Sequence, residues 1–299
     1  MAAQGARPDP HTAVKQELLV RYLDTWTPTV LRSHRRATYL ELSRDGSVAA
    51  ALRVFGEFAD RIAGHQLDVV VLGGPTESLA MVWNELGEPA GLTLRTVADP
   101  GGLEVSGPLL VHLDLVGESP LDEVTAWQLV VRIAAGAPNE VLATVPSVDL
   151  TGVEQHRARF ADAGLRHVAH VELTDDDGRT QLLLFATGTE RHLVAFKEAL
   201  WAADEYAGIR YRDPRDSEHA LIDISLTPQL VPLRRCLLAE LGRAGETSVA
   251  TLQRFTLTDT IYRPADAVRV LTSMASAGAI TRDPEKGRLT PRTVVRPVG

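Results

Sequence analysis

Short, uninterrupted apolar runs alternate with helical patterns along the first half of the chain, and this alternation restricts the fold more than any other feature. The runs lie at residues 37–42, 67–72, 109–113 and 140–145. The helical segments that follow the first three are residues 48–63, 76–86 and 121–134, and a further helix is predicted over residues 12–26. Strands buried on both faces read as continuous apolar stretches, and helices between them favour a parallel sheet.

A predicted hairpin follows these four strands. Residues 167–173 and 181–186 are apolar runs on either side of Asp-Asp-Asp-Gly-Arg at residues 175–179, a sequence typical of a turn. Four parallel strands followed by a closing antiparallel hairpin is the order of a class I methyltransferase-type Rossmann sheet. We therefore predict an α/β fold of this type.

Composition excludes several classes of protein. Apolar residues make up 44% of the 299 residues and charged residues 23%, as in ordinary globular proteins. No run reaches the roughly 18 apolar residues of a membrane helix, and the first ten residues lack the apolar segment of a signal peptide. The single cysteine, Cys236, excludes an internal disulfide and a cysteine-rich metal site. We expect a soluble, cytoplasmic protein.

The basic residues are uneven in kind and in position. Only Lys15, Lys197 and Lys286 are lysines, and the other 28 basic residues are arginine, a bias typical of a GC-rich genome. Residues 229–299 hold eleven Arg and Lys against six Asp and Glu, a net charge of +5, so residues 1–228 carry −13. This shift predicts a methyltransferase-like domain over residues 1–228 and a smaller basic domain over residues 229–299.

The pattern of the basic domain predicts a winged helix-turn-helix. Helices are expected over residues 232–242, 248–255 and 264–277, and a hairpin pairs residues 278–282 with residues 288–290. Six side chains are candidates for contact with nucleic acid or a protein partner: Arg254, Arg263, Arg269, Arg282, Lys286 and Arg288. Only Arg269 in the third helix could read base edges, which favours a protein partner and leaves nucleic acid as the alternative.

In parallel sheets ligands bind beyond the carboxyl ends of the strands, so this edge holds the candidate site. The candidate cofactor-binding residues are Gly46 after the first strand and Gly73 and Gly74 after the second. No G-x-G pair follows the first strand, where a cofactor needs close backbone approach. Asp114, at the end of the third strand, is the candidate catalytic or substrate-orienting residue.

Other polar residues give weaker signals. His167 and His170 fall on opposite faces of a strand, so no metal site is predicted. His112 is interpreted as a core histidine, and Glu140 is hypothesised to pair with Asp114 from the neighbouring strand. Trp201 is expected in the core at the domain junction, and residues 204–220 are expected to form a long surface loop.

An ordered series of short motifs resembles the three-Cys-motif partner family, TcmP. The motifs are Thr12-x-x-Lys15, Tyr22-Leu23-x-x-Trp26, the Tyr39–Leu42 strand, Gly46-Ser47 with Ala50-Ala51-Leu52, Pro108–Gly117, Asn139-Glu140-Val141-Leu142, Leu184-Phe185-Ala186-Thr187-Gly188, Lys197-x-x-Leu200-Trp201 and Thr260-x-Tyr262. They run in order along nearly the whole chain.

This resemblance implies a methyltransferase-like domain, a C-terminal winged helix and a partner that is a three-Cys-motif, radical-SAM-like enzyme. The chain departs from the family pattern after the first strand, where D-x-F-A-G-x-G is reduced to Glu41-Leu42-Ser43-Arg44-Asp45-Gly46-Ser47. Leu115-Val116 also replaces Pro-Phe in the third-strand motif. We therefore expect a degenerate, noncatalytic member that needs no cofactor. An active methyltransferase using S-adenosylmethionine in an altered pocket, or a winged-helix nucleic-acid-binding protein, are the alternatives.

Overall fold

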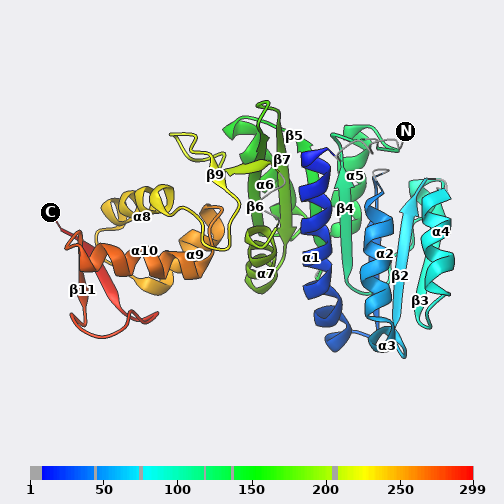
Figure 1. Ribbon diagram of the computed structural model, residues 1–299, viewed down its shortest axis with the longest axis horizontal. Helices are drawn as coiled ribbons and strands as arrows, with labels where there is room; N and C mark the ends of the chain where they lie inside the picture. The colour runs from blue at the N-terminus through cyan, green and yellow to red at the C-terminus, as the bar shows by residue number, and fades with distance from the viewer. Residues whose placement is uncertain are drawn as a thin grey trace, which may run out of the picture.

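A computed structural model describes residues 9–43, 46–73, 77–117, 119–135, 138–203 and 208–298 (Figure 1). The largest feature in these residues is a nine-stranded mixed sheet with the order β3-β2-β1-β4-β5-β7-β6-β8-β9. Its strands are β1 (Arg36–Glu41), β2 (Gln66–Leu72), β3 (Leu92–Val97), β4 (Leu109–Asp114), β5 (Glu140–Pro146), β6 (His167–Asp175), β7 (Thr180–Thr187), β8 (Ile209–Arg212) and β9 (Ile222–Asp223).

Strand direction gives the topology. Neighbouring strands from β3 through β5 pair in parallel, and β7 pairs antiparallel with both β5 and β6. The central order 3-2-1-4-5-7-6, with the seventh strand reversed, is the class I methyltransferase-type order predicted from the sequence. The four predicted parallel strands and the hairpin are confirmed.

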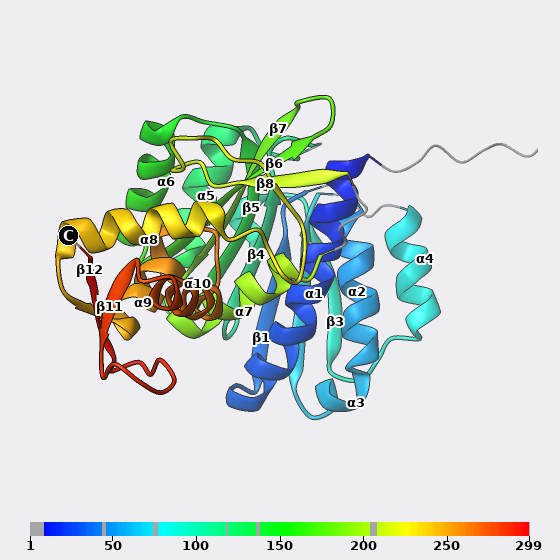
Figure 2. The ribbon, with the colours of Figure 1, turned by 60° about the vertical axis from the view of Figure 1, so that its left-hand side comes forward.

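Helices cover both faces of the sheet (Figures 1 and 2). They are α1 (Pro10–Ser33), α2 (Ser47–Glu57), α3 (Ala59–Ile62), α4 (Glu77–Leu86), α5 (Glu123–Ala134), α6 (Leu150–Asp162) and α7 (Glu190–Trp201), with a 3-10 turn η1 (Pro100–Gly102). Residues of α1, α2, α4 and α7 share one core with one face of the sheet, and α5 and α6 share a second core with the other face. Because both faces are covered, the central strands are almost wholly buried, as their continuous apolar runs predict.

The first helix begins where its sequence provides a cap. The Asp9 carboxylate accepts a hydrogen bond from the backbone N–H of Thr12 at 3.1 Å, and Pro10 occupies the first helical position. Apolar residues such as Leu18 and Tyr22 then recur at helical spacing and are buried. This helix places Lys15 beside the end of β4 and Tyr22 beside the start of β5.

Three strands of the sheet, β3, β8 and β9, were not predicted. The parallel edge strand β3 has the sequence Leu-Thr-Leu-Arg-Thr-Val, which lacks a continuous apolar run because most of its side chains are partly or fully exposed. Strand β8 lies within residues 204–220, so the predicted surface loop is wrong there. Tyr211 of β8 is fully buried and its hydroxyl donates to Leu200 O at 2.9 Å. Residues 204–207 lie outside the described residues.

The C-terminal part contains three helices and a small antiparallel sheet. Its elements are α8 (Val231–Ala244), β10 (Thr247–Ser248), α9 (Val249–Asp259), α10 (Pro264–Ser276), β11 (Ile280–Asp283) and β12 (Val294–Pro297), with the strand order β10-β12-β11. The three predicted helices and the first hairpin strand are confirmed. The predicted return strand at residues 288–290 is wrong, because Asp283 pairs with Val294 and the connection is longer.

Lys197 and Trp201 attach helix α7 to the turn between α9 and α10. Lys197 is fully buried, and its ammonium donates to four backbone carbonyls: Thr256 O at 3.1 Å, Leu257 O at 2.5 Å, Thr260 O at 2.6 Å and Tyr262 O at 2.9 Å. The Trp201 indole donates to Ile261 O at 3.0 Å and stacks on Tyr262 with ring centroids 5.6 Å apart. The predicted core position of Trp201 is confirmed, and one continuous apolar core joins the two parts.

In the part of the chain that the structure describes, no helix is both long enough and apolar enough to cross a membrane.

Candidate functional site

The carboxyl ends of β1 and β4 place a set of polar side chains under helix α1. Glu41 of β1 lies opposite His112 of β4, and Asp114 follows two residues later on the same face of the sheet. Lys15 reaches this edge from α1. Each of these four side chains is buried, although each carries charge or titrates. Burial of this kind requires that every polar atom be matched by a partner.

The Glu41 carboxylate accepts hydrogen bonds on both of its oxygen atoms. The Tyr39 hydroxyl donates to Oε2 at 2.6 Å. The Ser43 backbone N–H and hydroxyl donate to Oε1 at 3.0 and 2.5 Å, and His112 Nδ1 lies 2.8 Å from the same oxygen. Since a carboxylate only accepts, Nδ1 is the donor in this contact. Glu41 thereby holds the end of β1, the start of the following loop and β4 together.

The Asp114 carboxylate is matched in the same way. Its Oδ2 forms an ion pair with Lys15 Nζ, and its Oδ1 accepts from the backbone N–H groups of Val116 and Gly117 at 2.9 and 3.0 Å. Asp114 therefore ends β4 by turning the chain and ties that turn to α1. The predicted substrate-orienting role for Asp114 stays a prediction, and its partners come from within the fold.

The candidate glycines shape the turns at this edge. Gly46 has φ of 86° and precedes α2, and Gly73 has φ of 110° and donates its N–H to Val97 O at 2.8 Å. Both lie in the left-handed region that glycine adopts without strain. Gly74 lies outside the described residues, as do Arg44 and Asp45.

The hypothesised pair of Glu140 with Asp114 is wrong. Glu140 pairs in register with Leu110, and Asp114 pairs with Thr144, so the two carboxylates are four residues apart along the strands, about 13 Å. Glu140 is the first residue of β5 and therefore lies at the amino edge of the sheet. Its contacts there are with Tyr22 and His192.

The other histidines agree with their expected placement. His112 is a buried histidine of the core that contacts Glu41, and His170 is buried on β6 while His167 on the opposite face is partly exposed. The described residues contain no group of three His, Cys, Asp or Glu side chains arranged to hold a metal.

The six basic candidates of the C-terminal part differ widely in burial and in ion pairing. Arg263 is buried and its guanidinium binds Asp266, Glu198 and the Leu226 carbonyl, so its placement does not suit a surface contact. Arg254 pairs with Glu190 at 2.8 Å, and Arg282 donates to the Pro284 carbonyl at 2.9 Å.

The remaining three candidates lie at the surface, as Arg254 does. Arg269 is half exposed and lies 3.6 Å from Asp266. Lys286 and Arg288 are exposed in the connection between β11 and β12. The structure thus brings no tight cluster of these side chains together.

Sequence reasoning missed the partners of the two buried lysines. Lys15 entered only through a family motif, and its pairing with Asp114 joins residues 99 positions apart in the chain. The available signal was its rarity. In a chain with 28 arginines, a lysine inside an otherwise apolar helix face indicates a place where a compact ammonium fits and a planar guanidinium does not.

No protein-family model and no curated protein matches the chain. Solved structures do match in part. A Listeria monocytogenes protein assigned to the class I S-adenosylmethionine-dependent methyltransferases is 13% identical with a TM-score of 0.35, and the match covers 62% of this chain and 64% of that one. Magnesium protoporphyrin IX methyltransferase from Synechocystis PCC 6803, with bound S-adenosylmethionine, is 12% identical with a TM-score of 0.42 over 62% of this chain and 87% of that one.

The chain thus spans less than two-thirds of the length of the Listeria protein. At these scores the overlaps add no argument about activity. The strand order itself shows that this chain has a class I methyltransferase-like α/β fold.

Proposed function

We propose that this chain is a noncatalytic, methyltransferase-like partner protein, similar to TcmP, that binds and supports a three-Cys-motif, radical-SAM-like enzyme. The observation that carries the proposal is the internal matching of Glu41 and Asp114. Both carboxylates lie at the edge where a class I fold holds its ligand, and both have their oxygen atoms occupied by groups of the chain itself.

The described residues at this edge do not fit the usual pose of S-adenosylmethionine. A carboxylate that binds ribose or an amino group needs lone pairs directed at the ligand, and those of Glu41 are directed at Tyr39, Ser43 and His112. The segment from residue 41 to residue 47 also has one glycine where close backbone approach needs a glycine pair. Both features support the proposal that the chain keeps the methyltransferase-like fold without binding the cofactor.

The C-terminal part provides the proposed contact with the partner. Three helices followed by the β11–β12 hairpin fit a winged helix-turn-helix, and Lys197 attaches this module to helix α7. Helix α10 presents Arg269 as its single arginine toward the surface, and Arg263 is internal. This placement favours a protein surface over base readout, which needs several polar side chains.

The test is complex formation with the three-Cys-motif protein of the same genome. The two full-length chains are coexpressed and analysed by size-exclusion chromatography with light scattering. We expect one stable species containing both chains. An Arg269→Glu variant should weaken the complex at least tenfold, while Arg132→Glu, a matched change on the exposed face of α5, should leave it intact.

Two outcomes would contradict the proposal. Separate elution of both chains at micromolar concentration would remove the partner role. A salt-dependent shift of duplex DNA that is lost in Arg269→Glu would favour the nucleic-acid alternative instead.

A further inference from the structure

A pocket lies at the amino edge of the sheet, opposite the edge described above. It has a volume of about 160 Å³ and is bounded by helix α1, the start of α7 and the first residue of β5. The polar part of its lining includes Tyr22, Glu140, Arg191 and His192. Since ligands of parallel sheets bind at the carboxyl edge, this pocket is separate from the site of the fold family.

A buried carboxylate orients a histidine at the pocket wall. Glu140 is 1% exposed, and its Oε1 pairs with His192 Nδ1 while its Oε2 accepts from the Tyr22 hydroxyl at 2.6 Å. Because Nδ1 is directed at Glu140, Nε2 is the ring nitrogen left for other contacts. It forms no hydrogen bond with the residues that the structure describes, and the His192 side chain is 22% exposed. An imidazole oriented by a carboxylate in this way is held ready for a ligand.

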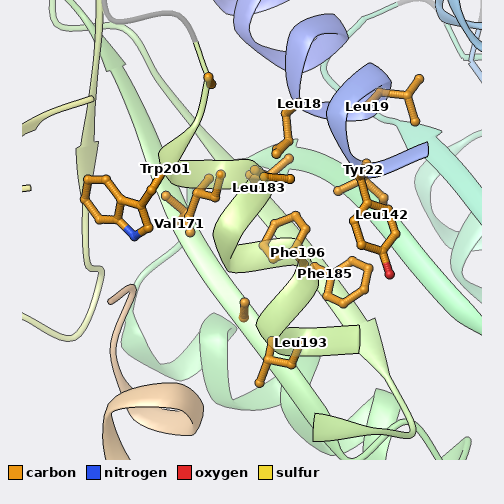
Figure 3. Close-up of a cluster of buried hydrophobic side chains, with 14 of the residues drawn as sticks. Leu18, Leu19, Tyr22, Leu142, Val171, Leu183, Phe185, Leu193, Phe196 and Trp201 are labelled. Atoms are coloured by element: carbon orange, nitrogen blue, oxygen red, sulfur yellow. The ribbon is translucent and has the colours of Figure 1, made fainter. Parts of the chain in front are cut away.

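The tyrosine is held as firmly as the histidine. Figure 3 shows the Tyr22 ring beside Phe185 and Phe196, with its hydroxyl directed away from the cluster. The centroid of the Tyr22 ring lies 4.9 Å from that of Phe185 and 6.0 Å from that of Phe196, and both contacts are edge-to-face. Burial, followed by the charge of Glu140, raises the pKa of Tyr22 well above its ordinary value, so the hydroxyl keeps its proton and donates. Tyr22 and His192 therefore occupy both oxygen atoms of Glu140, and the carboxylate needs no partner from a ligand.

The pocket has one cation that no carboxylate of the described residues pairs. The buried Glu140 carboxylate contacts Tyr22 and His192, whereas the exposed guanidinium of Arg191 forms no ion pair within the described part of the chain. The hydroxyls of Thr29 and Ser33 on α1 and the imidazole of His34 add further donors around the opening. Convergent donors with one unmatched cation favour a ligand with an anionic, acceptor-rich group.

The opposite wall is apolar. Trp26, Val30, Pro108, Pro138 and Ala195 contribute carbon surface to the pocket. An engineered cavity of about 150 Å³ in another protein holds benzene, so the volume here suits a six-membered ring or a branched chain of similar size. We propose that this pocket binds a small carboxylate with an aromatic or branched apolar body, its carboxylate paired with Arg191 and accepting from Nε2–H of His192 when the imidazole carries both of its protons.

The test uses sodium benzoate as the probe, with benzyl alcohol and benzylamine as neutral and cationic comparators of the same size. Binding to the full chain is measured at pH 6.5 by ligand-observed NMR titration. We expect benzoate to bind at least tenfold more tightly than either comparator. Arg191→Gln and His192→Gln should each weaken benzoate binding at least fivefold, and Arg132→Gln should leave it unchanged.

Three results would overturn the proposal: no benzoate binding at 20 mM, equal binding of all three probes, or equal benzoate affinity in Arg191→Gln and the wild type. Arg191 is exposed, so its variant is expected to fold and keeps the test decisive if His192→Gln does not. The pocket lies at the opposite edge from Asp114 and outside the C-terminal module. A failure of benzoate binding would therefore leave the partner proposal standing, and a failure of complex formation would leave the pocket proposal standing.

Discussion

The ammonium of Lys15 in the first helix forms a buried ion pair with Asp114, at the carboxyl end of the central strand β4. This contact joins α1 to the carboxyl edge of the sheet. It also uses an oxygen of the carboxylate that the sequence marks as the candidate catalytic residue. At this edge Asp114 holds α1 and the turn after β4 together.

Removing the lysine should therefore be costly. In Lys15→Met the Asp114 carboxylate stays buried with no cation beside it, and breaking one side of a buried pair costs about 3–5 kcal/mol. Chemical denaturation of the wild type and the variant measures this loss. The control is Lys286→Met, at an exposed lysine, which should change the free energy of unfolding by less than about 0.5 kcal/mol. A Lys15→Met loss below about 1 kcal/mol would show that the pair does not hold the edge.

Lys197 should not tolerate arginine. Its compact ammonium sits among four carbonyls, and a planar guanidinium is larger and differs in donor geometry. We expect Lys197→Arg and Lys197→Met each to lose about 3 kcal/mol or more, since carbonyls are left unmatched in both. Denaturation followed by circular dichroism measures the loss, and Lys286→Arg is the matched control. A Lys197→Arg variant as stable as the wild type would mean that the site is not shaped for lysine.

His170 should make the fold sensitive to acid. Burial, and then the nearby Arg215 and Arg157, lowers the pKa of His170 to about 2 from its ordinary value of 6.5. Both ring nitrogens lack a hydrogen-bond partner among the described residues. The unfolded chain takes up this proton below pH 6.5 and the folded chain does not. The contribution of His170 to the free energy of unfolding is thus fully present above pH 6.5. It decreases by about 1.4 kcal/mol per pH unit as the pH falls toward 2.

The measurement compares free energies of unfolding at pH 7.0 and pH 4.5. The free energy of unfolding of His170→Leu should fall by about 2.7 kcal/mol less than that of the wild type. This difference corresponds to the two pH units between 6.5 and 4.5. The exposed His34→Gln variant should keep the wild-type dependence. Parallel pH dependences in His170→Leu and the wild type would contradict the assigned environment.

The central fold could be predicted from the sequence because burial on both faces leaves a direct signature. Residues 67–72 and 109–113 are continuous apolar runs and form β2 and β4. Strand β3 lacks this signature since it lies at the sheet edge with exposed side chains. Strand β8 lies in a polar, charged stretch, where only the alternating Ile209 and Tyr211 are buried.

The candidate site was harder to predict because it depends on contacts between distant residues. Asp114 was correctly placed at a strand end, but its pairing with Lys15 crosses the whole first half of the domain. Glu140 was correctly placed at the start of its strand, and only its hypothesised pairing with Asp114 was wrong. The first residue of one parallel strand and the last residue of its neighbour lie at opposite edges of the sheet, so Glu140 pairs with Leu110 and Asp114 pairs with Thr144.

The most direct test of the account is titration of S-adenosylhomocysteine and S-adenosylmethionine into the wild-type chain, followed by calorimetry and by the melting temperature. We predict no heat of binding and no change in melting temperature at 1 mM ligand. A ligand present at one hundred times its Kd adds about 2.7 kcal/mol of stability, which raises the melting temperature of a chain of this size by roughly 5 °C. A rise of that size with either ligand would contradict the proposal that the carboxyl edge of the sheet binds no cofactor. It would restore methyl transfer as the function to pursue.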